Sequence, residues 1–442
     1  MGKDRGLTRI ATVFVAAGLI GAACGFDGES SDDTSPPATE AETTDTDAPV
    51  ETEAPPETEP PATEAPVETD PPADTEVPTD DEGSDDGPAE TDPPDDSTAP
   101  AEYDFSAIGP IVDGFVSERG LNGAGLLVVD AEDGLVHEEY WGEFGPDRIS
   151  LIASASKSVA AIVLNRLDDD GVIDLDQPVA EITGWDANPE ITTAQLLSNS
   201  SGLIGLAESL TSPPYLCSFV FDGTLTGCAE TVFTTPEDDD QVIPPDTEFR
   251  YGGAQWQIAG AVAEIASGES WDELIQRIVV EPCGLEAFGF ANHFSQYNSG
   301  FDYPADWDGD PASLAPTDNP NIEGGAYTTP GDYADLLLMQ LRGGMCGENQ
   351  VVSPDALDTM HSDRIAEVYD GSAGEGTGYG MGWWVDRGRG LINDPGAYGA
   401  FPWLDLDDGY GAYLVIELNS PTGAELAGLL FDPVEEAVLA AG

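Results

Sequence analysis

The sequence of 442 residues predicts an α+β fold, in which an antiparallel sheet is flanked by helices and carries an inserted helical lobe. Four strand-like runs lie in two pairs, near the start and near the end of the ordered part: 123–130, 135–141, 380–385 and 412–418. The region between them, about 172–350, is rich in helix-like and loop-like segments. Because strands from both ends of a segment can join one sheet, we expect a single two-lobed domain over 103–442.

The first 24 residues are typical of an export signal that ends in a cysteine. A basic start precedes an apolar run at 10–23, which is too short to span a bilayer and fits a secretory signal peptide. Residues 19–24 resemble a bacterial lipobox, in which the cysteine is lipidated, although Gly21 stands where an aliphatic residue is usual. We therefore expect an exported bacterial cell-surface lipoprotein, attached to the membrane only through Cys24, with plain secretion as the alternative.

Residues 25–102 consist almost entirely of Thr, Pro, Glu, Asp, Ala and Ser. With almost no large apolar residue, this region cannot bury enough surface to offset the entropy of ordering its chain. Repeats such as Thr-Glu-Ala-Pro and Thr-Asp-Pro-Pro favour a stiff, extended spacer. The sequence thus predicts a signal peptide over 1–24, a disordered acidic tether over 25–102 and one folded domain over 103–442.

Within the folded domain, local patterns predict the first and last elements. Apolar periodicity predicts a helix over 105–116. The turn-forming residues 131–134 join the first two strand-like runs in a hairpin. The last segment, 424–441, has a helical pattern that we expect to be interrupted at Pro433.

Five cysteines fit an exported protein. If Cys24 is lipidated, four remain in the folded part: Cys217, Cys228, Cys283 and Cys346. An even number in an oxidising compartment suggests two disulfides. Of the three possible connectivities we favour Cys217–Cys228, which closes a short loop, together with Cys283–Cys346.

Acidic residues dominate the chain, with 86 Asp and Glu against 13 Lys and Arg and a formal charge of −73. Such a charge repels nucleic acid and anionic membrane surfaces, so we expect neither as a partner. A small substrate would be neutral or cationic, and we expect a monomer. The histidines His137, His293 and His361 are far apart and no Cys-x-x-Cys is present, so we expect no metal and no cofactor.

The chain contains only two lysines, Lys3 in the predicted signal peptide and Lys157. From Ser154, apolar residues recur at helical spacing, which predicts a helix that ends near 168–171. Because residues i and i+3 share a helix face, Ser154 and Lys157 can meet, and a lysine amine can take the proton of a serine hydroxyl. The helix start would favour negative charge developing at Ser154. We expect carboxylates to be kept away from Lys157, since they would raise its pKa.

A tyrosine is the third candidate. Tyr251 stands just before a helix-like run at 256–266. A tyrosine near a serine and lysine pair can relay a proton between nucleophile and leaving group. Taken alone, such a tyrosine is more often a packing residue.

These residues carry a resemblance to the serine beta-lactamase and transpeptidase-like family, closest to its class C beta-lactamase and esterase branch. Segments similar to those of the family run in order through 105–442: Ser154 to Lys157 as S-x-x-K, 171–178, 195–203 with Asn199 in place of a histidine, Tyr251 as the start of Y-x-N, 324–333 and 379–383. Each segment is weak alone, and their order and spacing together carry the resemblance.

The resemblance implies a beta-lactamase/transpeptidase-like fold and a division of roles among the three residues. Ser154 is implied to be the nucleophile that forms an acyl-enzyme, with Lys157 as its base. Tyr251 is implied to protonate the leaving group and later to help activate water. Whether Lys157 or Tyr251 acts as the first base stays open at this point.

Two departures from the family pattern bear on the substrate. Gly253 replaces the asparagine of Y-x-N, and Gln255 is a candidate substitute for its amide. The third family motif, which carries a cation that attracts a substrate carboxylate, aligns with Asp394 to Gly396. Asp394 would repel a carboxylate by like charge, while Gly396 still lets the backbone approach the acyl group of a substrate. The Ala397 N–H is then expected to complete an oxyanion hole with that of Ser154.

Arg387 and Arg389 lie a few residues before the altered motif and could restore a cation, but solvated turn residues are the more natural interpretation. We therefore expect an exported serine hydrolase, an esterase or amidase acting on a small neutral or cationic ester or amide. A D-Ala-D-Ala carboxypeptidase-like or beta-lactamase activity is the second interpretation. A non-catalytic cell-surface binding module of the same fold is the third.

Overall fold

The computed structural model describes residues 103–441 except 207–209, 237–238, 299, 366–368 and 370–371. The predicted signal peptide, the lipidation site at Cys24 and the acidic tether lie outside the described residues.

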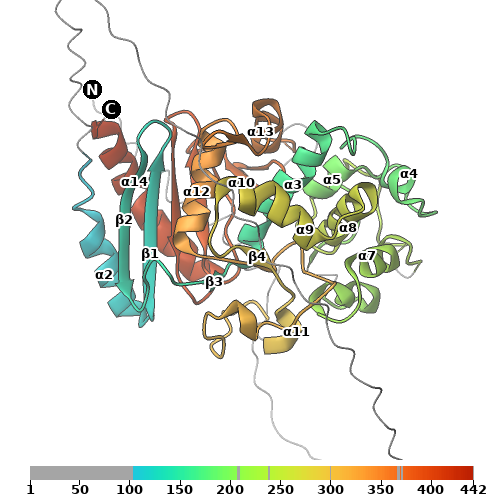
Figure 1. Cartoon of the computed structure of the whole chain (residues 1–442), viewed down its shortest axis with the longest axis horizontal. Helices are drawn as coiled ribbons and strands as arrows, with labels where there is room; N and C mark the ends of the chain where they lie inside the picture. The colour runs from blue at the N-terminus through green and yellow to red at the C-terminus, as the bar shows by residue number, and fades with distance from the viewer. Residues whose placement is uncertain are drawn as a thin grey trace, which may run out of the picture. The chain divides into compact units, whose positions relative to one another are not determined.

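A seven-stranded antiparallel sheet is built from both ends of the domain, as predicted (Figure 1). Its strand order is β2-β1-β12-β11-β10-β9-β8. The bounds are β1 (Gly123–Asp130), β2 (Gly134–Gly142), β8 (Thr377–Tyr379), β9 (Trp384–Asp386), β10 (Leu391–Asn393), β11 (Phe401–Asp405) and β12 (Tyr410–Val415). The two ends meet where β1 pairs with β12, so that Gly125 lies opposite Val415 and Asp130 opposite Tyr410.

Helices cover both faces of this sheet (Figure 1). Helices α2 (Ile108–Arg119) and α14 (Ser420–Ala441) pack on one face, where the Trp403 ring lies 5.1 Å from that of Phe431. Helix α12 (Pro330–Leu341) packs on the other face, where Tyr333 stacks on Tyr413 at 4.4 Å. Burial of these large aromatic side chains on both faces supplies much of the hydrophobic stabilisation of the sheet.

The helical lobe lies beyond α12 (Figure 1). Its helices are η1 (Ala153–Ser156), α3 (Lys157–Asp169), α4 (Val179–Thr183), α5 (Thr193–Leu197), η2 (Pro213–Phe219), α7 (Leu225–Phe233), α8 (Gln255–Ser267), α9 (Trp271–Ile275), η3 (Gln276–Val280), α10 (Glu281–Cys283), α11 (Phe294–Tyr297), η4 (Pro311–Ser313) and α13 (Pro354–His361). Small sheets complete the fold, formed by β3 (Ser150–Leu151), β5 (Ala326–Thr328) and β4 (Gly289–Phe290), and by β6 (Met345–Cys346) and β7 (Asn349–Gln350).

Two predicted elements differ from the structure. The run 380–385 is not one strand, because residues 380–383 form the turn between β8 and β9, where Gly382 has φ of 81°. Helix α14 is not interrupted at Pro433 but continues through it, with Leu430 and Val434 fully buried on either side. Packing against the sheet outweighs the hydrogen bond that proline removes from the helix.

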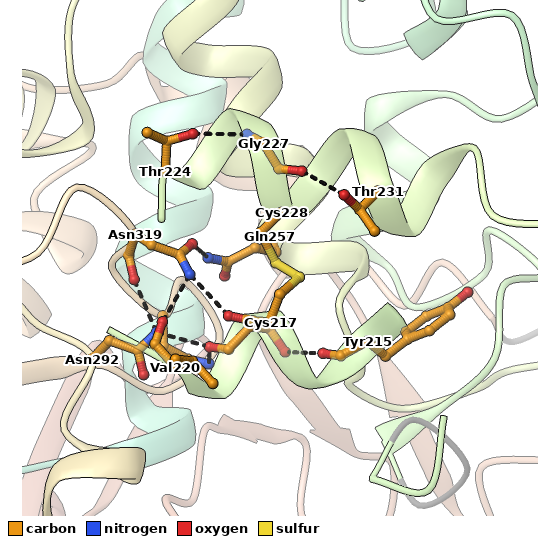
Figure 2. Close-up of a disulfide and its surroundings, with 12 residues drawn as sticks. Tyr215, Cys217, Val220, Thr224, Gly227, Cys228, Thr231, Gln257, Asn292 and Asn319 are labelled. Atoms are coloured by element: carbon orange, nitrogen blue, oxygen red, sulfur yellow. Dashed lines mark hydrogen bonds between the residues drawn. A yellow bond between two sulfur atoms is a disulfide. The ribbon is translucent and has the colours of Figure 1, made fainter. Parts of the chain in front are cut away.

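Both predicted disulfides are present. Cys217–Cys228 joins η2 to α7, with Cα atoms 5.6 Å apart (Figure 2). Cys283–Cys346 joins α10 to β6, with Cα atoms 4.9 Å apart. Among the described helices, none has the length and apolar character needed to cross a membrane.

Candidate active site

Ser154 lies in the 3₁₀ turn η1, which leads from strand β3 into helix α3; the regular α-helix begins only at Lys157. The residue before the serine, Ala153, has φ of 46°, a left-handed conformation that is uncommon for a residue with a Cβ and costs strain. Ser156 fixes the turn, because its Oγ donates to the Ala153 carbonyl at 2.6 Å and accepts from the Ala326 N–H at 3.0 Å. The small β3-β5-β4 sheet thereby holds the serine in place.

Lys157 contacts Ser154 directly, as the spacing predicted. Its side chain is fully buried, and Nζ donates to Ser154 Oγ at 3.1 Å and to the Glu323 carbonyl at 2.7 Å. Burial is the main cause that lowers the pKa of the Lys157 ammonium, and the carboxylates of Glu323 and Asp394 oppose it. The expectation that carboxylates are kept away from this lysine is therefore wrong.

Tyr251 joins the same cluster. Lys157 Nζ lies 5.0 Å from the centre of the Tyr251 ring, and the Tyr251 ring packs against Trp384 at 4.9 Å. Burial, with the nearby charge of Asp394, raises the pKa of the buried Tyr251 hydroxyl far above its usual value. Ser154 and Trp384 lie close enough to lower that pKa in part, although no described group meets strict hydrogen-bond geometry with the hydroxyl. Tyr251 is thus a phenol that keeps its proton near neutral pH.

Asn199, which replaces the histidine of the family segment, holds the turn that presents Tyr251. It has φ of 56°, and its Oδ1 accepts from Gly252 N at 3.1 Å, Gln255 Nε2 at 3.0 Å and Trp256 Nε1 at 3.2 Å. Gln255 Nε2 also donates to the Gly252 carbonyl at 2.6 Å. The Gln255 amide therefore serves the turn itself, and the suggestion that it replaces the missing amide of Y-x-N is not supported.

Asp394 was expected to face the substrate, but its side chain is fully buried against the start of helix α3. Its Oδ2 accepts from the Ser158 N–H at 3.0 Å, which is a favourable place for a carboxyl at a helix N-terminus. Burial raises the pKa of Asp394 to about 8, against the opposing effect of Lys157. Burial thus favours the protonated form of this acid.

Gly396 packs closely on the protein's own backbone. A Cβ at this position would lie 2.0 Å from the Ile152 carbonyl oxygen and 3.4 Å from Ala155 N. The backbone that leads to Ala397 therefore packs directly on the turn that holds Ser154.

The two arginines before this turn serve other partners. Arg387 Nε donates to Asp363 Oδ2 at 2.7 Å, and Arg389 Nη2 lies 2.9 Å from Asp432 Oδ1. Each guanidinium is thus paired with a carboxylate, which favours the interpretation that neither restores the missing cation of the third motif. The prediction of solvated side chains is wrong for Arg389, whose side chain is only 6 % exposed and lies over the Phe431 ring.

Glu323 is the member of the cluster that sequence reasoning missed. It is only 4 % exposed, and its carboxylate Oε2 lies 3.6 Å from Lys157 Nζ. Burial raises the pKa of the Glu323 carboxyl, and the Lys157 ammonium opposes this. An acidic residue beside two glycines carried no signal in a chain with 86 acidic residues.

Buried amides hold the loop that carries Glu323, beside the Cys217–Cys228 disulfide (Figure 2). Asn319 Nδ2 donates to the carbonyls of Cys217 and Val220, each at 2.8 Å, and Gln257 Nε2 donates to Asn319 Oδ1 at 2.8 Å. The Gln257 Oε1 accepts from Ile322 N at 3.1 Å. Helix α8 and the disulfide therefore fix the residue immediately before Glu323.

A cavity of about 690 Å³ lies elsewhere in the domain, with Trp271, Tyr327 and Glu264 among its lining residues. Ser154, Lys157 and Tyr251 do not line it. We therefore do not count it as part of the candidate site.

Comparisons with known proteins show which proteins this chain is similar to. Residues 110–432 match the family described as Beta-lactamase. Penicillin-binding protein 4 of Amycolatopsis lactamdurans is 25 % identical over 334 residues, which cover 70 % of this chain and 83 % of that protein. A solved structure from Bacteroides dorei, titled as a candidate beta-lactamase, is 28 % identical with a TM-score of 0.59 and covers 76 % of this chain and 100 % of its own.

A further solved structure, EstCE1, titled a hydrolase with promiscuous acyltransferase activity, shares the fold at 18 % identity with a TM-score of 0.60. It matches 76 % of this chain and 99 % of its own. The fold is thus that of the serine beta-lactamases and penicillin-binding proteins. The chain belongs to the beta-lactamase family.

Proposed function

We propose that this protein is a serine hydrolase, an esterase or amidase that forms an acyl-enzyme on Ser154. The observation that carries the proposal is the hydrogen bond of 3.1 Å between the buried Lys157 Nζ and Ser154 Oγ, with the Tyr251 ring beside them. A serine hydroxyl is a weak nucleophile until a neighbour takes its proton, and a desolvated lysine amine is suited to that task.

In the proposed acylation, neutral Lys157 takes the Ser154 hydroxyl proton as Oγ bonds to the substrate carbonyl carbon. The carbonyl oxygen becomes an oxyanion, with the N–H groups of Ser154 and Ala397 as the proposed donors. Lys157 then returns a proton through the Tyr251 hydroxyl to the leaving oxygen or nitrogen as its bond to carbon breaks. Attack of water on the acyl group releases the acid and restores the Ser154 hydroxyl.

The charges around the site favour neutral or cationic substrates. Asp394 supplies no cation at the third motif, and Arg387 and Arg389 are paired with carboxylates. Lys157 is itself fully buried, beside the Glu323 carboxylate. A substrate carboxylate would therefore find no counter-charge among these groups, which favours a simple ester or amide over a beta-lactam.

Labelling with a fluorophosphonate probe tests the proposal. We expect the folded wild type to be labelled and Ser154→Ala to remain unlabelled. Equal labelling of the two proteins, or no labelling of the wild type, would support the non-catalytic binding module instead.

A penicillin-binding or beta-lactamase activity is the second candidate, because a curated relative is a penicillin-binding protein. Comparing turnover of a p-nitrophenyl ester with that of a chromogenic cephalosporin separates the two. We expect the ester to be hydrolysed faster, and fast cephalosporin turnover would contradict the argument from the missing cation.

We also propose that the protein is exported and anchored by lipid at Cys24. The two disulfides support an oxidising compartment. Metabolic labelling with a fatty-acid analogue in a bacterial host tests the anchor: we expect incorporation into the wild type and none into Cys24→Ala.

A further inference from the structure

Glu323 is a buried acid whose side chain the proposed reaction has not used. Both of its carboxylate oxygens are shielded from solvent and lack a described partner that meets strict hydrogen-bond geometry. A buried carboxylate without such donors is costly unless a charge compensates it. Within the described residues, Lys157 is the cation that lies within 4.0 Å, with 3.6 Å between Nζ and Oε2.

The surroundings of Lys157 Nζ are completed by this same residue. Nζ donates to Ser154 Oγ and to the Glu323 carbonyl, while the Glu323 carboxylate lies on a third side. The rings of Tyr251 and Trp256, at 5.0 and 5.9 Å, face the ammonium and exclude water. Backbone and side chain of one glutamate therefore hold the amine against the serine.

Glu323 also lies beside the glycine pair 252–253, where the Y-x-N segment has its second and third residues. Gly253 has φ of 74°, and a Cβ there would lie 2.8 Å from the Ile204 carbonyl oxygen, so an asparagine would be strained. The neighbouring Gly252 is so close that a Cβ would lie 3.1 Å from Glu323 Oε2. The Gly253 N–H also lies near enough to this carboxyl to lower its pKa. The carboxylate thus sits beside the backbone that lost the side-chain amide.

We propose that Glu323 is a positioning residue and the counter-ion of Lys157. In this role it stabilises the ammonium that forms when Lys157 accepts the proton of Ser154. The catalytic part of this role depends on the proposed function, whereas the ion pair does not. The other nearby acid, Asp394, accepts instead from the Ser158 N–H at the start of helix α3.

Selective labelling of lysine tests the ion pair without any assay of activity. The full chain has only Lys3 and Lys157, so ¹³Cε-lysine gives two signals, and Lys157→Arg identifies the one that disappears. A nearby opposite charge shifts a pKa by about 1–3 units, so we expect Glu323→Gln to lower the Lys157 pKa by about one unit or more. Asp394→Asn should shift it less over the range below pH 8.

A control is Glu264→Gln, since Glu264 is a half-buried glutamate of the helical lobe that accepts from Trp271 N at 2.9 Å and does not contact Lys157 in the described structure. It should leave the Lys157 titration unchanged. If Glu323→Gln does not fold, Glu323→Asp keeps the charge on a shorter side chain and should give a smaller fall of the pKa. An unchanged Lys157 pKa in the folded variant, or a larger shift in Asp394→Asn, would overturn the proposal.

Kinetics then test the catalytic part. In Glu323→Gln we expect kcat for a p-nitrophenyl ester to fall about tenfold or more, with KM nearly unchanged and the acid limb of the pH profile moved to lower pH. A wild type that fluorophosphonate does not label refutes the proposed function alone. A labelled wild type whose pH profile is unmoved in Glu323→Gln refutes the role of Glu323 alone.

Discussion

Two turns pack against each other at this site, and they compare with the family pattern in opposite ways. The turn from Ala153 to Lys157 has the serine and lysine of the family motif, and its geometry depends on their side chains. The turn from Asp394 to Ala397 has lost the family's cation but keeps the glycine that packs on the Ile152 carbonyl. Side-chain chemistry thus defines the first turn and backbone shape the second. We expect a difference of this kind to alter substrate preference while leaving the proposed nucleophile, Ser154, in place.

The largest effect is expected at the first turn. Lys157→Ala should reduce kcat about 10²–10⁴-fold, because it removes the proposed base. Lys157→Arg is the matched control: it keeps the charge but cannot lose a proton near neutral pH, so it should be equally inactive. Steady-state hydrolysis of a p-nitrophenyl ester measures both. An active arginine variant would show that the lysine serves only as a charge.

At Gly396, in the second turn, the expected effect comes from added side-chain volume. Gly396→Ala places a methyl group 2.0 Å from the Ile152 carbonyl oxygen, so the two turns must move apart. We expect a loss of stability of about 1–3 kcal/mol, measured by urea unfolding, with a fall in kcat. Gly390→Ala is the control for added volume. Gly390 has φ of 81°, so an alanine there is strained, but its Cβ would meet no atom within 4 Å. Full activity of Gly396→Ala would separate the two turns functionally.

The charge of the second turn should appear as a pH dependence of stability. The pKa of Asp394 is raised by burial to about 8, so between about pH 4 and 8 the folded state binds a proton that the unfolded state has lost. Stability from this group is present at low pH and decreases as the pH rises towards 8. Asp394→Asn should remove that decrease. The Tm of the variant minus the Tm of the wild type should therefore increase from pH 5 to pH 8. A constant difference in Tm would contradict the raised pKa.

The smallest effect is expected at Arg387, which pairs with Asp363 at the domain surface. Partly exposed ion pairs contribute about 0–1 kcal/mol, so Arg387→Ala should change stability within that range. Ester hydrolysis should keep its KM. A raised KM for anionic esters alone would assign Arg387 to substrate binding and restore a cation to the second turn.

Much of the fold followed from local sequence. The hairpin of β1 and β2 has a turn signal between two apolar runs, and the serine and lysine are three residues apart on one helical surface. Both disulfides were predicted from parity and loop length. The hairpin and the serine–lysine contact depend on neighbours in the chain, which is why the sequence reveals them, whereas the Cys283–Cys346 pairing follows from the even number of cysteines once Cys217 and Cys228 close their short loop.

The features that were missed depend on distant contacts. At Gly382 the backbone has a positive φ and packs on the backbone of Lys157. This turn divides the predicted strand 380–385. Asp394 and Glu323 come from segments that lie 71 residues apart in the sequence. Their sequence neighbours do not indicate that these two side chains are buried. The direction of a carboxylate, towards a helix start or towards an ammonium, is decided by tertiary packing alone.

The burial of Lys157 has one practical consequence. A protease that cuts only after lysine has a single target in the described domain, and that target is fully shielded in the folded state. Cleavage there requires the η1 turn and the start of α3 to open. The rate of one cut, between Lys157 and Ser158, therefore reports how often the centre of the molecule becomes accessible, without any added probe.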